Sequence, residues 1–519
     1  MSHSLVNGGN NHCHTTDAGK NEESNAGNPY SNWKYFYLAA TFFVVLGAIL
    51  LHIRNLDKNE EWAGKKLKPK ISVKEAKPIV LLKHEGYQQP DRIFKHVRHV
   101  FEVYGYEVTY NTSVEWDILW TLNSPFETDL ALTNLKPHQR VNKVPGNDYV
   151  VLKNEFVSSG GKNIPPAFRL PQDSDEFLKY AEENPSSQFL EKSHIERNSK
   201  HIFLKPVKDI NLNADDKFVQ LFVPNPLLID GKKFEFGVYV VVTSIHPLRL
   251  YRMQEDVLVR FTTQPYYPFD ISKRSKYITQ NFHQHSTSES VNKYIKYSNS
   301  IQECFEAILQ TLGADPEQIW RQVDESIVSV YLAQEKSIIS KLYKFENTRN
   351  FFELLRFDFL IDEDFKVHAI EADPSPSLFG RFKQDEIKFE QILNSLFSLV
   401  GLSSHLHPPL ETSKKARRMM AHERNIMVFP EVCLNCTDCS KFECKLCATC
   451  LSGDVSLDLQ MAYREHLSRF RARRVFPPIM TQEEAKRGIP AEFNCLLSGK
   501  NILIYQWFRG KCLLDKSWC

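Results

Sequence analysis

Apolar residues recur with the periods of strands and helices from Lys77 onward. The run Ile79–Leu82 is short and apolar, which is typical of a buried strand. Residues 90–103 place their apolar side chains at helical spacing, and residues 107–110 and 116–122 have the apolar runs of two further strands. Strand–helix–strand order favours a small parallel sheet. We therefore expect a small α/β subdomain where the folded region begins.

The middle of the chain predicts a larger α/β domain. The segments 357–360 and 367–372 indicate a hairpin that is joined by the acidic turn Asp362–Asp364. Apolar runs and helical periods predict strands at 217–223, 233–244 and 247–253, and helices at 292–312, 316–341 and 384–400.

An uncharged apolar segment lies near the N-terminus. Residues 35–53 contain no Asp, Glu, Lys or Arg, and nineteen residues at helical rise span about 28 Å, close to a bilayer core of about 30 Å. This predicts one transmembrane helix and a single-pass anchor, with a buried core helix as the alternative. Two lysines precede the segment and seven Lys or Arg residues follow it within 54–74, which favours a cytosolic domain. A lumenal orientation is the alternative.

Composition divides the chain further. The net charge of +2 points to no partner, but nine cysteines fall in the last 87 residues and indicate a separate C-terminal module. The expected segments are a disordered tail at 1–34, the transmembrane helix at 35–53, a charged linker at 54–75, the main α/β domain at 76–405, a basic linker at 406–432, a Cys cluster at 433–450 and a basic extension at 451–519.

Three carboxylates converge in the predicted hairpin. Asp358 lies on its first strand, while Glu371 and Asp373 lie two apart on the second and share one face. Such carboxylates repel one another unless a cation is present, and oxygen ligands suit Mg²⁺, which usually bridges to nucleotide phosphates. The alternative is an exposed acidic face without a metal.

The hairpin also resembles a known family. Residues 352–358 and 371–376 are similar to the metal-binding end of tubulin–tyrosine ligase-like proteins, in which Asp373 corresponds to a residue that is usually Asn. The resemblance covers roughly residues 77–405, and several short matches in the expected order are more specific than any single one. Those further matches lie at 142–146, 152–154, 226–234 and 242–249.

The resemblance implies an ATP-grasp-like ligase domain, preceded by the small α/β subdomain, that binds ATP and Mg²⁺. By this resemblance Lys153 and Lys192 would contact the phosphates. A hinge strand would bind the adenine through its backbone at Gln220, Leu221, Phe222 and Val223. The metal would be held by Asp358, Glu371 and Asp373, and the residues implied for the reaction are Arg249, Glu235 and Lys192. Arg249 and Arg260 are candidates to bind phosphate or the incoming amino acid, and an ordinary salt bridge is the alternative for either.

The family resembled joins an amino acid to a protein carboxylate. The carboxylate takes the γ-phosphate of ATP and becomes an acyl phosphate, and an amine then displaces the phosphate. The resemblance implies tubulin or microtubules as the partner and glutamate as the amino acid, with glycine and tyrosine as alternatives. No nucleic acid is expected.

Three departures from the family pattern fall on phosphate and substrate contacts. Residues 196–202 correspond to the phosphate-covering loop but contain no glycine. Gly237 stands where the family has an arginine, and residues 277–280 read Tyr-Ile-Thr-Gln in place of His-x-Thr-Asn. The alternative is therefore a catalytically silent, membrane-anchored scaffold or tubulin-binding protein on the same fold.

Six cysteines form a compact cluster with the spacing C-x2-C-x2-C-x4-C-x2-C-x2-C. Paired C-x2-C units in a cytosolic protein favour tetrahedral Zn²⁺, whereas disulfides in a secretory lumen are the alternative. The glycosylation sequons Asn111–Ser113 and Asn435–Thr437 fit that alternative, but the charge asymmetry favours zinc. The candidate ligands are Cys433, Cys436, Cys439, Cys444, Cys447 and Cys450.

Basic residues flank the cluster, within 414–424 and within 464–474. A basic surface beside the ligase site would steer acidic tubulin tails toward it. Anionic lipid or nucleic acid would fit the same charge.

Overall fold

The computed structural model describes Gly47 and residues 77–84, 90–194, 201–279, 288–378, 383–403, 423–494 and 496–519. Apart from Gly47, the predicted transmembrane helix at 35–53 lies outside the described residues, as do the predicted tail and charged linker. Within the described part of the chain, no helix is both long enough and apolar enough to cross a bilayer. The chain divides into two compact units, Met1–Ala76 and Lys77–Cys519, and the strands of the described residues belong to the second.

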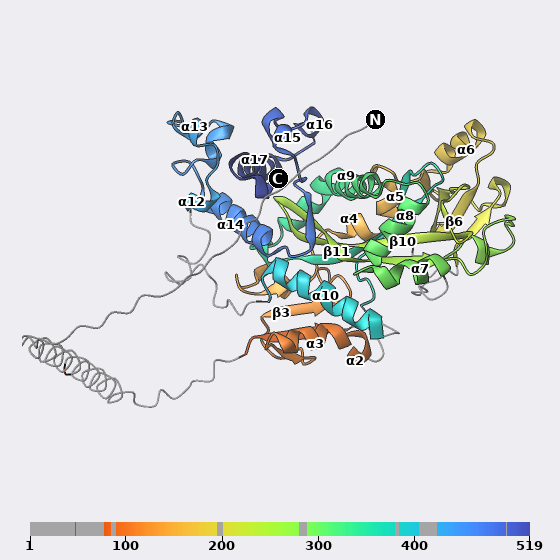
Figure 1. Ribbon diagram of the computed structural model, residues 1–519, viewed down its shortest axis with the longest axis horizontal. Coiled ribbons are helices and arrows are strands. Elements are labelled where there is room, and N and C mark those ends of the chain that lie inside the picture. Colours follow the sequence, from red (N-terminus) through yellow and green to blue (C-terminus); the bar gives the residue numbers. More distant parts are fainter. Residues whose placement is uncertain are drawn as a thin grey trace, which may run out of the picture. The chain divides into compact units, whose positions relative to one another are not determined.

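Four short strands form a parallel sheet in the order β2-β1-β3-β4, which confirms the predicted strand–helix–strand subdomain (Figure 1). Its buried side chains Val80 and Phe101 share one apolar core with Phe397, so helices α3 and α10 pack against it. The elements are β1 (Ile79–Lys83), α2 (Pro90–Ile93), α3 (Lys95–Val103), β2 (Glu107–Thr109), β3 (Ile118–Thr121), β4 (Arg140–Val141) and α10 (Lys383–Val400).

A large sheet is the centre of the molecule. Its strands follow the order β13-β12-β10-β11-β14, all pairs are antiparallel, and β9 pairs with the start of β10. The predicted hairpin is present as β12 and β13. Helices α8 and α9 pack on this sheet through a core that includes Phe236, Trp320 and Phe359. The elements are β9 (Leu228–Ile229), β10 (Lys232–Ile245), β11 (Leu248–Phe261), α7 (Glu289–Tyr294), α8 (Ile301–Thr311), α9 (Pro316–Leu342), β12 (Glu353–Ile361), β13 (Val367–Asp373) and β14 (Ala472–Phe476).

A third sheet is small and antiparallel, in the order β5-β8-β6-β7. Helix α6 packs on it through Phe177, which contacts Phe168 and Phe189. The elements are α4 (Asp148–Val151), α5 (Lys153–Ser158), β5 (Ala167–Arg169), α6 (Ser174–Glu183), β6 (Phe189–Ser193), β7 (Phe203–Lys205) and β8 (Lys217–Leu221).

The C-terminal region continues the main fold. Its strand β14 pairs with β11 in the large sheet, and its helices surround a core of their own with Trp507, Phe508 and Trp518. Sequence alone predicted a separate C-terminal module here, with a Cys cluster and a basic extension, whereas β14 is a strand of the large sheet. The elements are α12 (Glu423–Ile426), α13 (Pro430–Cys433), α14 (Gly453–Ser468), α15 (Gln482–Arg487), α16 (Ala491–Asn494) and α17 (Gly499–Leu514).

The cysteine cluster is closed by disulfides, which corrects the prediction of a zinc site. A sulfur bonded to another sulfur offers no thiolate to a metal ion. A fourth bond, Cys512–Cys519, joins α17 to the last residue of the chain. The three bonds of the cluster are Cys433–Cys447, Cys436–Cys444 and Cys439–Cys450.

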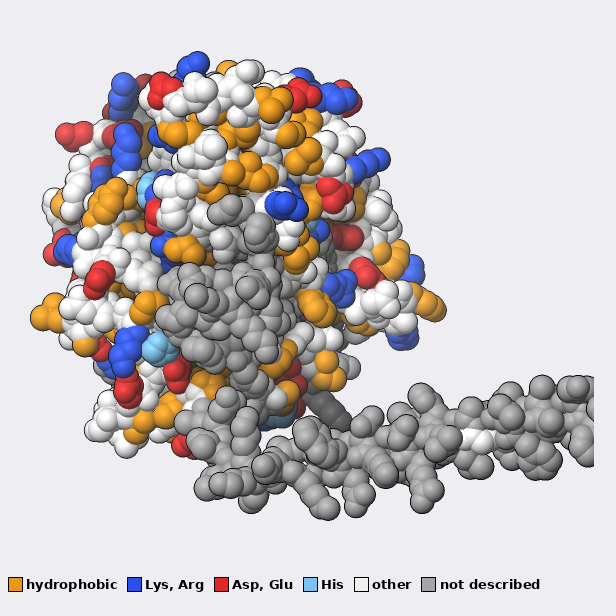
Figure 2. Space-filling model, turned by 90° about the vertical axis from the view of Figure 1, so that its left-hand side faces the viewer, with side chains coloured by type: hydrophobic (Ala, Val, Ile, Leu, Met, Phe, Trp, Pro, Cys, Tyr) orange, Lys and Arg blue, Asp and Glu red, His pale blue; other side chains and the backbone are white. Residues whose placement is uncertain are grey.

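The basic residues of 464–474 are mostly engaged within the protein. Arg474 is buried and its Nε donates to the carbonyl of Pro477 at 2.7 Å, while Arg473 lies 3.5 Å from Asp324. On the face in Figure 2, basic and acidic side chains are interspersed rather than gathered into one basic patch. Of the first basic segment, 414–424, residues 414–422 lie outside the described residues.

Candidate active site

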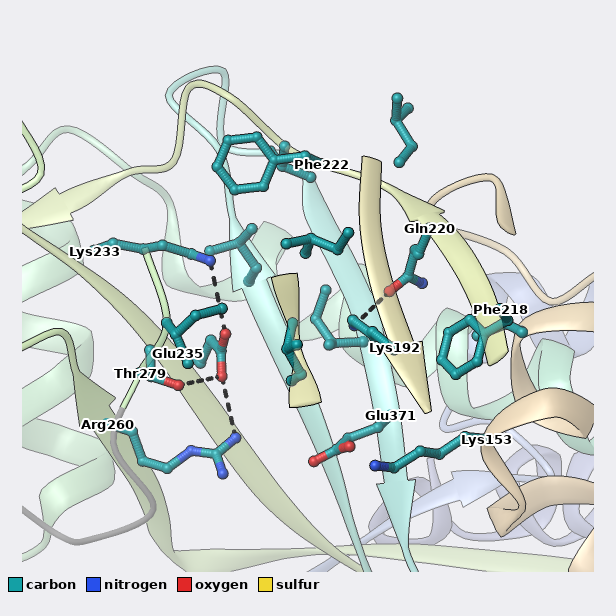
Figure 3. A pocket seen from close by; sticks show the side chains of 18 residues that line it. Lys153, Lys192, Phe218, Gln220, Phe222, Lys233, Glu235, Arg260, Thr279 and Glu371 are labelled. Carbon is teal, nitrogen blue, oxygen red and sulfur yellow. Dashed lines mark hydrogen bonds and ion pairs between the residues drawn. The ribbon is translucent and has the colours of Figure 1, made fainter. Parts of the chain in front are cut away.

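A cavity opens between the small antiparallel sheet and the large sheet (Figure 3). One part of its wall is apolar and includes Phe218 and Phe222 from β8 and the residue after it, together with Leu360 of β12. The polar part brings together side chains that are far apart in the sequence, from Lys153 to Glu371. An apolar wall beside a charged one suits a ligand with a flat ring and a charged tail.

The charges in the wall do not balance. The lining contains four basic side chains and two acidic ones, so the formal excess is two positive charges. In Figure 3 the amine of Lys153 and the carboxylate of Glu371 point toward each other, with the other cations around them. A low-dielectric cavity with this excess favours an anion. The basic residues are Lys153, Lys192, Lys233 and Arg260, and the acidic ones are Glu235 and Glu371.

Lys192 is held in place by Gln220, a residue predicted separately from it. The Lys192 Nζ donates to Gln220 Oε1 at 2.7 Å, from β6 to the neighbouring β8. Burial lowers the pKa of Lys192 to about 8, against the opposing charges of Glu371 and Glu235. The other end of the Gln220 amide, Nε2, is buried and has no partner among the described residues. A ligand acceptor would satisfy it.

The predicted adenine hinge lies in the cavity wall. Gln220, Leu221, Phe222 and Val223 all line it. However, the backbone N–H groups of Leu221 and Phe222 already donate to the carbonyls of Pro166 and Gln188, each at 2.8 Å. These two donors hold the small sheet together, so a ring bound here would use other backbone atoms of the segment.

A hydrogen-bonded group surrounds Glu235. Thr279 Oγ1 donates to Glu235 Oε2 at 2.7 Å, and the Arg260 guanidinium lies 3.3 Å from the same oxygen. Lys233 Nζ donates to the Tyr277 carbonyl at 2.8 Å. Glu235 is thus in the site as predicted. Sequence reasoning did not select Lys233 or Thr279. Lys233 belongs to the segment 226–234, which matched the family pattern, and Thr279 belongs to 277–280, which departed from it.

The two strands of the acidic hairpin bring Asp358 opposite Glu371 and Arg356 opposite Asp373. Burial alone would raise the pKa of Asp358, but Arg260 and Arg356 outweigh burial and lower this pKa to about 2. Glu371 hydrogen-bonds to Asp358, and burial together with the Asp358 charge raises the pKa of Glu371. Within this pair, burial and the Asp358 charge therefore act against the charged form of Glu371, while Lys153 and Arg260 act in the opposite direction.

Arg356 is a further residue that sequence reasoning did not select. Its Nε donates to Asp358 Oδ1 at 2.6 Å, its terminal nitrogen donates to Asp358 Oδ2 at 2.9 Å, and it lies 3.4 Å from Asp373. Gly237 on the neighbouring strand makes this possible. A Cβ at position 237 would lie 2.6 Å from Asp358 Oδ1 and 2.7 Å from Arg356 Cδ.

The predicted magnesium ligands are therefore arranged differently from the expectation. Asp358 and Glu371 are adjacent, but Asp358 is bonded to two arginines and Asp373 faces Arg356. In the described ranges, no three Asp, Glu, His or Cys side chains are grouped to hold a metal ion. Of the three predicted ligands, Glu371 is the one that lines the cavity.

Arg249 lies outside the cavity, which corrects its predicted catalytic role. It is fully buried on β11, and its Nε donates to Glu465 Oε2 on α14 at 2.9 Å. Thr243 and Tyr251 donate to the same oxygen. A guanidinium enclosed in this way attaches α14 to the sheet and does not face the cavity.

Comparison with known proteins finds one family model and several relatives that carry the name of the same enzyme class. The model of the tubulin-tyrosine ligase family matches residues 131–414. The probable tubulin polyglutamylase ttll-15 of Caenorhabditis elegans is 32% identical over 446 residues, which are 82% of this chain and 83% of that protein. The tubulin polyglutamylase TTLL6 of Mus musculus is 26% identical over 316 residues, 56% of this chain and 37% of that protein. The tubulin polyglutamylase ttll-4 of Caenorhabditis elegans is 28% identical over 290 residues, 52% and 47% of the two chains.

Proposed function

Because the chain belongs to the tubulin-tyrosine ligase family and is a ligase, we propose that it uses ATP to join glutamate to carboxylates of an acidic protein tail, with tubulin as the acceptor. The observation that carries this proposal is the cavity, which combines an apolar wall with an excess of positive charge. The glutamate and the tubulin acceptor rest on the names of the relatives.

The cavity residues fit a nucleoside triphosphate. The apolar wall with Phe218 and Phe222 suits the base, and the buried donor of Gln220 lacks an acceptor among the described residues. Lys153, Lys192 and Arg260 would neutralise phosphate charge. Mg²⁺, when bound with ATP, further neutralises the phosphates, and Glu371 is the residue that would contact it.

The chemistry then needs no covalent enzyme intermediate. An acceptor carboxylate oxygen attacks the γ-phosphorus of ATP, ADP leaves, and an acyl phosphate forms. The amine of free glutamate attacks the acyl carbon, loses a proton and expels inorganic phosphate, which leaves an amide. Lys192 and Arg260 lower the energy of the charged transition states by staying protonated while phosphate moves.

The direct test incubates the full-length protein with tubulin, ATP, Mg²⁺ and each labelled amino acid in turn. We expect glutamate to be incorporated, and Lys192→Met to abolish incorporation. Lys179→Met is the matched control, because Lys179 is exposed on α6 of the same small sheet region and should leave activity unchanged.

Two outcomes would contradict the proposal. If no amino acid is incorporated but ATP still raises the melting temperature, the cavity binds nucleotide without ligase activity. If ATP also leaves the melting temperature unchanged, the chain is a silent binding protein on the same fold. The second candidate is favoured by Arg356, which occupies the oxygens of Asp358.

A further inference from the structure

Eight cysteines of this chain are paired, in two separate places. Three disulfides close the segment 433–450, and the fourth ties α17 to Cys519. Of the cysteines in the described ranges, Cys304 alone is free, and it is buried. Burial raises the pKa of the Cys304 thiol to about 11, so it is a poor nucleophile. Thus the described part of the chain presents no reactive thiol at its surface.

The disulfides are structural and not incidental. Between 430 and 450 the chain forms only short helical turns, with Val432 and Leu434 exposed at 40% and 85%. A segment with so little apolar core needs cross-links to keep one conformation. Cys512 is fully buried in the apolar core of the large sheet, against which Cys519 also packs, so their bond ties the end of α17 to that core.

Structural disulfides persist in oxidising compartments, where no reducing system returns them to thiols. The cytosol reduces structural disulfides, and proteins that depend on several of them fold in oxidising compartments. The excess of Lys and Arg after residue 53 favours the opposite orientation, but that excess is a statistical bias. The four disulfides, in contrast, are specific covalent pairings within the folded domain.

Two glycosylation sequons are accessible in the same protein. Asn111 lies in the exposed turn between β2 and β3, where its own side chain accepts from the Ser113 N–H at 3.0 Å. Asn435 is exposed within the disulfide segment. An oligosaccharide is attached to Asn-x-Ser/Thr at the surface of proteins that enter the secretory pathway. Both asparagines meet the condition of exposure.

We infer that residues 77–519 fold and act on the extracytoplasmic side of a membrane, with glycans on Asn111 and Asn435 and eight cysteines oxidised. This inference rests on the proposed ligase reaction and changes one part of it: the acceptor in the cell becomes an acidic protein segment of that compartment instead of tubulin. Tubulin, whose tails carry the same carboxylate chemistry, is the acceptor that tests the reaction in vitro. The ATP is drawn from the same compartment.

The test uses the full chain expressed in animal cells. Denatured, unreduced protein is treated with a maleimide reagent that adds mass, before and after reduction. We expect the eight cysteines to react only after reduction. Digestion with an N-glycosidase should increase gel mobility in two steps, one removed by Asn111→Gln and one by Asn435→Gln. Asn213→Gln is the control, because Asn213 is exposed but followed by Ala-Asp.

The inference is overturned if the eight cysteines react without reduction, or if N-glycosidase leaves the mobility of the wild type unchanged. Neither result depends on activity. A glycosylated, oxidised protein that incorporates no amino acid would contradict only the proposed reaction. A reduced, unglycosylated protein that glutamylates tubulin would contradict only the compartment.

Discussion

Arg356 reaches across Gly237 to bond Asp358, and each of these residues depends on the others. The glycine leaves the space that the Arg356 side chain fills, and a Cβ at 237 would overlap Asp358. Asp373, which stands where the resembled family has Asn, faces the same guanidinium. Two departures that looked independent in sequence are thus the surroundings of one arginine.

This interdependence predicts that Gly237→Arg has opposite effects on stability in the wild type and in an Arg356→Gly variant. Gly237→Arg in the wild type should lower the free energy of unfolding by about 1–3 kcal/mol, because the new side chain overlaps Arg356 and Asp358. Arg356→Gly should cost about 3 kcal/mol, because Asp358 loses a buried partner. In the Arg356→Gly background, Gly237→Arg should instead stabilise, since a guanidinium returns from the neighbouring strand. Urea unfolding of the four proteins measures the cycle, and additive effects would contradict it.

The same pair predicts a dependence on pH. The pKa of Asp358 is about 2 in the folded protein, below its usual value, so its contribution to stability is present above the unfolded pKa and is lost as pH falls. Arg356→Gly raises the folded pKa. The stability difference between wild type and variant should therefore be largest at neutral pH and shrink below about pH 4. A constant difference in urea unfolding from neutral to acid pH would contradict this cause.

Lys192 predicts how nucleotide binding depends on pH. Its pKa of about 8 means that the lysine is charged at neutral pH and loses its proton as pH rises through that value. ATP affinity should therefore fall as pH rises, measured by calorimetry. Lys192→Arg keeps its charge over this range and should bind with little change, whereas Lys192→Met should bind weakly at every pH. An unchanged wild-type affinity above about pH 9 would show that Lys192 does not contact the anion.

At the scale of elements, α14 is attached to the large sheet by one buried carboxylate. Glu465 accepts hydrogen bonds from Arg249 and Thr243 at 2.9 Å and from Tyr251 at 3.1 Å. Glu465→Ala should lower the free energy of unfolding by about 3–5 kcal/mol, because Arg249 is left buried without its partner. The double variant Glu465→Met with Arg249→Met should lose less free energy of unfolding than Glu465→Ala, because neither charge is then left buried alone. ATP affinity of the folded fraction should stay unchanged, and a loss of affinity would return Arg249 to the active site.

This pair also shows where prediction from sequence ends. The two strands around Arg249 follow from local apolar periods, although β11 continues to Phe261, past the predicted end at residue 253, and α14 was not predicted. The role of Arg249 does not follow from local sequence, because its partner Glu465 is 216 residues away. Lys153, Lys192 and Gln220 were found through short matches to a family, and the fold brings them together. Cysteine spacing, in contrast, is the same for zinc and for disulfides, so only the pairing in three dimensions decides between them.

On the scale of the whole molecule, the disulfide region and the ligase fold belong to one compact unit. Strand β14 hydrogen-bonds to β11, and α14 packs near α10. Unfolding of the C-terminal region would uncover the edge of β11, and an exposed edge is an aggregation site. The cysteines therefore matter for the cavity even though none of them lines it.

Reduction should consequently destabilise the entire domain in one step. Disulfides of this loop length contribute about 2–3 kcal/mol each, so a reducing agent should lower the melting temperature of the ATP-binding domain by many degrees. We expect one transition, seen both by intrinsic fluorescence and by loss of ATP binding, because β14 is part of the same sheet as β10 and β12. The melting temperature of the variant Cys512→Ala with Cys519→Ala should lie between those of the oxidised and the reduced wild type. If reduction leaves the melting temperature unchanged, the disulfides do not stabilise the folded domain. If it produces a separate early transition, the C-terminal region unfolds alone and β11 is stable without β14.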